Sequence, residues 1–392
     1  MADSDIYMQA HDAADANGLV SLPDSENQVK ILLTTLPARD NAPTTGLDLD
    51  TDDYTECLFL DDAIRDKIVK TPNFPQSVPH VIEKLFRIGS SPGKGLGMFA
   101  TQDIEMGDFI HAARPLIIVP VKFVKEWHIF QEKLLFLCIK RLSLEGQVAF
   151  MNLTHSHIPM NGCDRNHQIK AIISTNGFGM NIFYEPESDS CTYSAVYKDI
   201  SRINHSCSPN VQIIFDVPSF SCQLRAVRPI KKDTEFTIQY TDIFQSYEER
   251  KKALVPYQIE CTCMSCSNPK ESNQFREELR QAVDVKALRG SWLADTSLPG
   301  DLIVEHCSGW IRKLDQWGLQ SLERYRYYLW YAYTAAVALG DAELAHKFGT
   351  NFARRLLVDL PQDQGVDTIK IYSDRDKCRK EPGWRIRGER TV

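Results

Sequence analysis

The sequence Asn-His-Ser-Cys at residues 204–207 is followed further along the chain by Cys-Thr-Cys-Met-Ser-Cys at residues 261–266. One thiol therefore stands beside an Asn-His pair, and three more gather within one short stretch. Four thiolates complete a tetrahedral structural zinc site. Such a site would join two distant stretches of chain and would place the Asn-His pair beside the metal. The expected metal ligands are Cys207, Cys261, Cys263 and Cys266.

The composition is that of a soluble globular chain. Its 392 residues are 43% hydrophobic and 25% charged, which suits two or three domains. The polar start and the lack of a long apolar run favour an intracellular, reducing compartment and no membrane association. Its 11 cysteines show no disulfide-framework spacing, so the tight cluster is interpreted as a metal site.

The charge balance bears on partners. A net charge of -7 argues against direct nucleic-acid binding and suits a basic peptide substrate. Much of the negative charge lies in residues 1–76, which we expect to be largely disordered. Two apolar pieces in this segment, 29–33 and 57–60, leave a docking or autoinhibitory role open beside that of a solvated tail.

The pattern after residue 80 predicts short strands and tight turns. A strand at 86–88 runs into a loop with glycines at 93, 95 and 97, which is either a plain hairpin or a place where backbone approaches a ligand. Helical spacing at about 121–170 predicts an insertion. Further expected strands lie at 172–173, 176–180, 193–197, 211–215, 222–227 and 236–240.

The last of these strands ends at Tyr240. Taken alone, this residue would be a half-buried strand tyrosine whose hydroxyl reaches water. The Asn204-His205 pair likewise has an ordinary alternative, which is to satisfy buried backbone at a sharp turn.

Three motifs together resemble those of the SET-domain protein lysine methyltransferases. Residues 91–97 resemble the family's first cofactor loop, 204–210 its Asn-His-Ser-Cys-x-Pro-Asn motif, and 235–240 its catalytic-tyrosine strand. The resemblance implies an α+β fold, the SET fold of small β-sheets with a pseudoknot. The implied regions are an acidic segment 1–76, a SET domain 80–242 with a helical insertion at about 121–170, a zinc-binding post-SET segment 243–268 and an all-helical region 269–392.

The resemblance also implies two cofactors, S-adenosylmethionine and zinc. Transfer of a methyl group to a lysine amine is an in-line displacement, which depends on position more than on acid or base strength. The expected catalytic residues are Tyr240 and Tyr257. The expected cofactor-binding residues are Lys94, Gly95, Leu96, Asn176, Asn204, His205, Tyr240, Tyr257 and Ile259.

The layout is most similar to the SET-and-MYND branch, in a fungal-type form without the cysteine-rich MYND finger. Helical segments near 322–339 and 341–357 resemble one helix pair of a tetratricopeptide array. Relatives often carry an aromatic residue where Ile259 stands. With isoleucine at this position, weaker apolar contact would replace stacking on the adenine base.

Two functions therefore remain open. One is a protein-lysine N-methyltransferase that acts on a histone tail or another lysine-bearing protein in the nucleus or cytoplasm. The other is a catalytically weak or inactive SET scaffold that serves as a protein-interaction module, with the helical region as a surface for protein partners.

Overall fold

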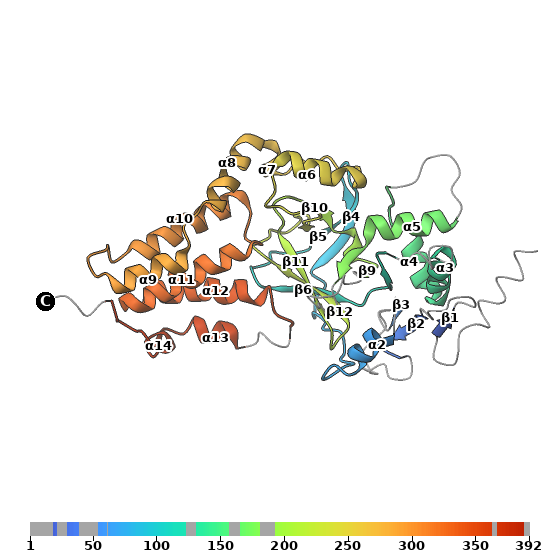
Figure 1. Cartoon of the computed structure of the whole chain (residues 1–392), viewed down its shortest axis with the longest axis horizontal. Coiled ribbons are helices and arrows are strands. Elements are labelled where there is room, and N and C mark those ends of the chain that lie inside the picture. The colour runs from blue at the N-terminus through green and yellow to red at the C-terminus, as the bar shows by residue number, and fades with distance from the viewer. Residues whose placement is uncertain are drawn as a thin grey trace, which may run out of the picture. The chain divides into compact units, whose positions relative to one another are not determined.

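The computed structural model describes residues 19–21, 30–38, 54–60, 62–122, 131–156, 165–180, 193–362 and 367–387. The chain divides into two compact units (Figure 1). The first unit comprises 1–80, 112–202 and 215–222, and the second comprises 81–111, 203–214 and 223–392. The predicted SET range of 80–242 thus contributes segments to both units.

The first unit contains a six-stranded sheet. Strands β3 and β7 are parallel, and the other neighbouring strands pair antiparallel. Every residue of β3, β7 and β9 is buried, as suits strands in the middle of a covered sheet. The strand order is β1 (Leu19–Ser21), β2 (Lys30–Leu36), β3 (Thr55–Phe59), β7 (Ile117–Pro120), β9 (Tyr193–Val196) and β8 (Phe178–Met180).

Three helices make up the predicted insertion: α3 (Gln131–Arg141), α4 (Leu144–Met151) and α5 (Arg165–Asn176). Leu134, Leu135 and Cys138 of α3 and Ile169 and Ile172 of α5 enter one apolar core with β3 and β7. The strand predicted at 172–173 is therefore wrong. Ile169 and Ile172 are three residues apart and share the buried face of a helix, a spacing that the isolated Ile-Ile pair conceals.

The described part of the predicted acidic segment 1–76 contains strands and a helix. Within this segment β2 and β3 pair over five residues each, and α2 (Asp62–Val69) follows. Ile31, Leu32 and Leu58 are fully buried, so the two short apolar pieces supply enough core to order their surroundings. The acidic run at 48–53 lies outside the described residues.

The second unit holds the small strands that surround the Asn-His motif. β4 (Phe86–Ser91) and β5 (Gly95–Ala100) form an antiparallel hairpin, and β10 (Asn204–His205) pairs in parallel with β13 (Thr237–Ile238). A further sheet with the order β11 (Val211–Asp216), β12 (Ser221–Ala226), β6 (Phe109–Ala113) contributes residues to both units.

In the described residues from 247 onward, the regular elements are all helices. Figure 1 shows α10, α11 and α12 packed side by side. The helix termini explain why the elements end where they do: Gly318 and Gly340 adopt left-handed φ values of 64° and 73°, and Asp341 caps α12. The helices are α6 (Tyr247–Leu254), η4 (Val255–Tyr257), α7 (Met264–Ser267), α8 (Pro269–Arg280), α9 (Val285–Ala294), α10 (Leu302–Trp317), α11 (Glu323–Leu339), α12 (Ala342–Leu357), α13 (Thr368–Tyr372) and α14 (Arg375–Cys378).

The C-terminal helices are attached directly to the loop after the Asn-His motif. Ser208 Oγ donates to the carbonyl of Trp317 at 2.8 Å, and Arg228 Nη2 donates to the carbonyl of Ser208 at 2.9 Å. A Cβ at Gly318 would collide with the Arg228 guanidinium, so the left-handed glycine also permits this close approach. In the described part of the chain, no helix combines the length and apolar character needed to cross a bilayer.

Candidate active site and four-cysteine centre

The glycine-rich hairpin forms the first wall of the predicted cofactor site. Its turn lies between β4 and β5, where Gly93 and Gly95 adopt φ values of 73° and 80°. The N–H of Lys94 donates to the carbonyl of Ser91 at 3.0 Å and closes the turn. Lys94, Gly95 and Leu96 are exposed at this tip, as expected of residues that meet a ligand.

The Asn-His strand and the tyrosine strand lie side by side. Asn204 pairs with Thr237 and His205 with Ile238 in a short parallel ladder. Asn210, which is 4% exposed, holds this arrangement. Its Oδ1 accepts from the N–H of Thr237 at 2.7 Å, and its Nδ2 donates to the carbonyl of Glu235 at 2.8 Å.

Glu235 connects the hairpin tip to the Asn-His strand. Its Oε1 accepts from Asn204 Nδ2 at 2.7 Å, and its Oε2 pairs with Lys94 Nζ at 3.2 Å. Asn204 Nδ2 also donates to the carbonyl of Leu96 at 3.1 Å. A Cβ at Gly97 would collide with the Glu235 carboxylate, so this glycine makes room for the contact. The site thus presents one cation, one carboxylate and one amide within a single hydrogen-bonded group.

Tyr240 is fixed at both ends. Its backbone N–H donates to His205 Nδ1 at 3.0 Å, and its hydroxyl donates to the carbonyl of Ile203 at 2.6 Å. The ring lies 5.4 Å from the ring of His205 and 5.3 Å from that of Tyr257, measured between centroids. The two expected catalytic tyrosines are therefore neighbours in an aromatic cluster.

Burial controls the ionisation of Tyr240. Removal from water is the main reason that the pKa of its phenol is raised well above the ordinary value. The nearby Tyr257 and Glu235 raise this pKa further. The hydroxyl therefore stays protonated at neutral pH and acts as a hydrogen-bonding group.

Tyr257 and Ile259 flank a sharp reversal of the chain. Tyr257 ends η4, and Gln258 adopts a left-handed φ of 55° before Ile259. Both Tyr257 and Ile259 are partly exposed, so both remain accessible to a ligand.

The four cysteines predicted from the sequence come together. The Sγ atoms of Cys207, Cys261, Cys263 and Cys266 all lie within 4.8 Å of one another. A tetrahedral zinc with sulfur ligands at about 2.3 Å places its sulfur atoms about 3.8 Å apart, so the cluster has the size that zinc needs.

His205 connects this cluster to Tyr240. Because Nδ1 accepts from the Tyr240 N–H, the ring proton resides on Nε2, which donates to Cys207 Sγ across 3.3 Å. The ring is 3% exposed, so these contacts leave little room for it to turn.

Asn176 belongs to the first unit, where it ends α5. Its Nδ2 donates to the carbonyls of Thr154 at 2.6 Å and Ile172 at 2.8 Å, so both donors stabilise the helix terminus. The other predicted cofactor residues belong to the second unit, and the proposed role of Asn176 rests on the resemblance.

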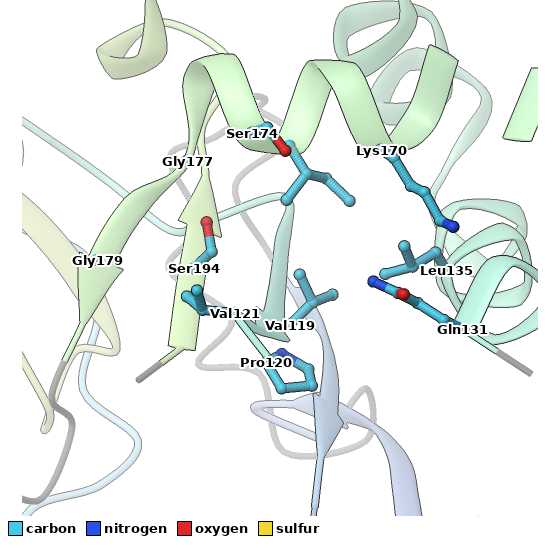
Figure 2. A pocket seen from close by; sticks show the side chains of 11 residues that line it. Val119, Pro120, Val121, Gln131, Leu135, Lys170, Ser174, Gly177, Gly179 and Ser194 are labelled. Atoms are coloured by element: carbon cyan, nitrogen blue, oxygen red, sulfur yellow. The ribbon is translucent and has the colours of Figure 1, made fainter. Parts of the chain in front are cut away.

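The same unit contains a cavity of about 380 Å³ between α5 and β7 (Figure 2). Lys170 and Ser174 project from α5, and Val119 and Pro120 belong to β7 on the opposite side. The Lys170 ammonium is paired with Glu132 at 2.8 Å, so its charge is already satisfied. Nothing in the lining identifies a ligand.

Two residues of the site were missed as functional candidates. In the sequence, Glu235 and Asn210 enter only as members of the motifs at 235–240 and 204–210, and neither has a role of its own. Their places at the ends of those motifs are the signal that identifies them.

Residues 95–241 match the family described as "SET domain", so this part of the chain is similar to the SET-domain proteins. The predicted α+β SET fold is thereby confirmed.

Three curated relatives extend the comparison. Histone-lysine N-methyltransferase SMYD3 of Homo sapiens is 46% identical over 189 residues, which are 45% of this chain and 42% of that protein. Histone-lysine N-methyltransferase set5 of Schizosaccharomyces pombe is 26% identical over 202 residues, 50% of this chain and 55% of that protein. N-lysine methyltransferase SMYD2 of Homo sapiens is 31% identical over 115 residues, 29% of this chain and 25% of that protein.

The similarity to SMYD3 and SMYD2 confirms the predicted likeness to the SET-and-MYND branch. The chain spans less than half the length of SMYD3 and about half that of set5.

Proposed function

We propose that this chain is an S-adenosylmethionine-dependent protein-lysine N-methyltransferase. The observation that carries the proposal is the parallel pairing of β10 with β13, together with the hydrogen bond from the Tyr240 N–H to His205 Nδ1. Hydrogen bonds at its hydroxyl and at its backbone N–H hold the buried Tyr240 in one position. Methyl transfer depends on such preorganised geometry.

The residues at the hairpin tip fit the amino-acid end of S-adenosylmethionine. Lys94 and Glu235 supply one charge of each sign, which complement the carboxylate and the ammonium of such a group. Gly95 and Leu96 offer backbone groups at the exposed tip, and Asn204 and His205 are the further polar residues. Tyr257 and Ile259 would cover the adenine end of the cofactor. Asn176 is the remaining proposed cofactor-binding residue, and its role rests on the family resemblance.

When bound, the cofactor supplies a methyl group on a positively charged sulfur. Tyr240 and Tyr257 would line the path of the lysine, exclude water and present oxygen atoms to the partly positive carbon and nitrogen. Tyr240 keeps its proton because burial raises its pKa, so it does not serve as the base. The lysine amine would instead lose its proton to water, since a dry site beside a cation lowers the pKa of an amine.

The proposed metal is zinc, held by Cys207, Cys261, Cys263 and Cys266. Its role is structural, because four thiolate ligands leave no open position for chemistry. Zinc would tie the segment that carries Tyr257 and Ile259 to the Asn-His strand.

The proposed substrate is a lysine-bearing protein, either a histone tail or another protein. SMYD3 and set5 are named histone-lysine methyltransferases, and SMYD2 an N-lysine methyltransferase. A net charge of -7 suits a basic peptide. We place the enzyme in the nucleus or cytoplasm, and assign the tetratricopeptide-like helices of 269–392 to contacts with protein partners.

The test is transfer of a labelled methyl group from S-adenosylmethionine to histones and to proteins of a cell extract. The wild-type chain is expected to label protein, and Tyr240→Phe to lower the rate about 100-fold, by analogy with loss of one active-site hydrogen-bonding group. Equal labelling by both chains would contradict the role of Tyr240. Cofactor binding without labelling of any protein would favour the interaction scaffold.

A further inference from the structure

Two arginines lie buried beside the four-cysteine cluster. Arg250 on α6 and Arg276 on α8 both have an exposed fraction of 0%. A charged side chain removed from water costs several kcal/mol unless it is paired, so each needs a compensating negative charge.

The oxygen atoms that accept hydrogen bonds from these two side chains are neutral. Arg276 Nε donates to the carbonyl of Ile243 at 2.7 Å, and its Nη2 donates to Ser265 Oγ at 3.3 Å. Arg250 Nη1 donates to the carbonyl of Gln245, and its Nε and Nη2 are buried and have no hydrogen-bond partner in the described part of the chain. Backbone carbonyls and hydroxyls satisfy hydrogen bonds but do not cancel charge.

The anionic groups that act on both arginines are sulfur atoms of the cluster. Arg250 interacts with Cys207 and Cys266, and Arg276 with Cys207, Cys263 and Cys266. Four thiolates around a divalent cation carry a net charge of about -2, whereas four protonated thiols or two disulfides carry none. The charge of two guanidinium groups balances that of the metal centre with four thiolates. With four thiols or two disulfides, the two positive charges would have no negative counterpart.

We propose that Arg250 and Arg276 are a charge-compensating pair that sets the affinity of the four-cysteine centre for a divalent metal. They offset the double negative charge of the loaded centre and favour the four-thiolate state over thiols or disulfides. Because they lie on α6 and α8, the metal also fixes the helices on both sides of the cysteine segment. This role is independent of methyl transfer and is read from zinc binding alone.

The test is zinc affinity of the full chain, measured by competition with a chromogenic chelator. Arg250→Met removes the charge at similar length, and affinity should fall about 10- to 100-fold, the usual loss when a group that supports a metal ligand is removed. Arg250→Lys keeps the charge and should recover most of that loss. Arg355→Met is the matched control, because Arg355 on α12 is also buried but pairs with Asp359. Its zinc affinity should equal that of wild type.

Equal losses in Arg250→Met and Arg250→Lys, or unchanged affinity in Arg250→Met, would overturn the proposal. If the Met variant does not fold, Arg250→Lys and Arg276→Lys decide: affinities within about 10-fold of wild type support charge compensation, and larger losses refute it.

Discussion

His205 accepts the backbone N–H of Tyr240 on one ring nitrogen and contacts Cys207 Sγ with the other, across 3.0 Å and 3.3 Å. One imidazole therefore joins the expected catalytic tyrosine to an expected metal ligand. Loss of the metal would release Cys207 and, through the ring, the backbone at Tyr240.

Removal of zinc is expected to destabilise the second unit. Binding of a structural metal is part of the folding free energy, so a strong chelator should lower Tm by at least about 10 °C, and added zinc should restore it. Atomic emission should find about one zinc per wild-type chain and less in Cys263→Ser. Cys307→Ala is the control: this thiol is buried away from the cluster, and its zinc content should stay at the wild-type level. A Tm that the chelator leaves unchanged would argue against a structural metal.

Asn210→Ala should weaken the link between β13 and the Asn-His strand. It leaves the N–H of Thr237 and the carbonyl of Glu235 without their partners, at a cost of about 3 kcal/mol in the free energy of unfolding. Urea denaturation measures this loss. Asn268→Ala removes an exposed asparagine that also bonds the backbone, and should change stability by less than about 0.5 kcal/mol. Similar losses of unfolding free energy in the two variants would contradict the role of Asn210 in linking β13 to the Asn-His strand.

Glu235→Gln should weaken cofactor binding. The amide still accepts from Asn204, but the negative charge that pairs with Lys94 and faces the cofactor ammonium is lost. A charge-assisted contact of this kind corresponds to about a 10-fold rise in the Kd for S-adenosylmethionine. Glu305→Gln, an exposed change on α10, is the control and should bind as wild type does. An unchanged Kd in Glu235→Gln would remove this residue from the site.

The rate should rise with pH and show no fall caused by Tyr240. Burial raises the pKa of its phenol, so ionisation lies above the ordinary value of about 10, while the protonated substrate lysine limits the rate at lower pH. The measurement is kcat/KM between about pH 7 and about pH 10, with circular dichroism at each pH to confirm that the chain is folded. A falling limb that is present in wild type and absent from Tyr240→Phe would contradict this assignment.

The sequence was most informative where chemistry depends on residue type and spacing. Cysteines at 207 and 261–266 predict a cluster because four thiols serve few purposes other than a metal, and the structure places their sulfur atoms together. The tyrosine strand could be placed beside the Asn-His motif only through the family resemblance, since nothing in local pattern predicts a two-residue parallel ladder.

What the sequence could not provide depends on burial. Arg250 lies in the charged stretch 247–252, whose composition predicts exposed side chains. Its side chain is nevertheless fully buried. Ile31 and Leu58 lie in segments flanked by polar residues, and their order depends on pairing between β2 and β3 that no local pattern reveals. Long-range contacts of this kind determine burial, and they are absent from local periodicity.

Binding of S-adenosylmethionine to the zinc-loaded chain is the most direct test, because every role assigned to the site requires it and no substrate need be known. Isothermal titration calorimetry is expected to give a Kd in the micromolar range with one cofactor bound per chain. Absence of binding to folded, zinc-loaded protein would contradict the methyltransferase and leave a SET scaffold that acts through protein contacts.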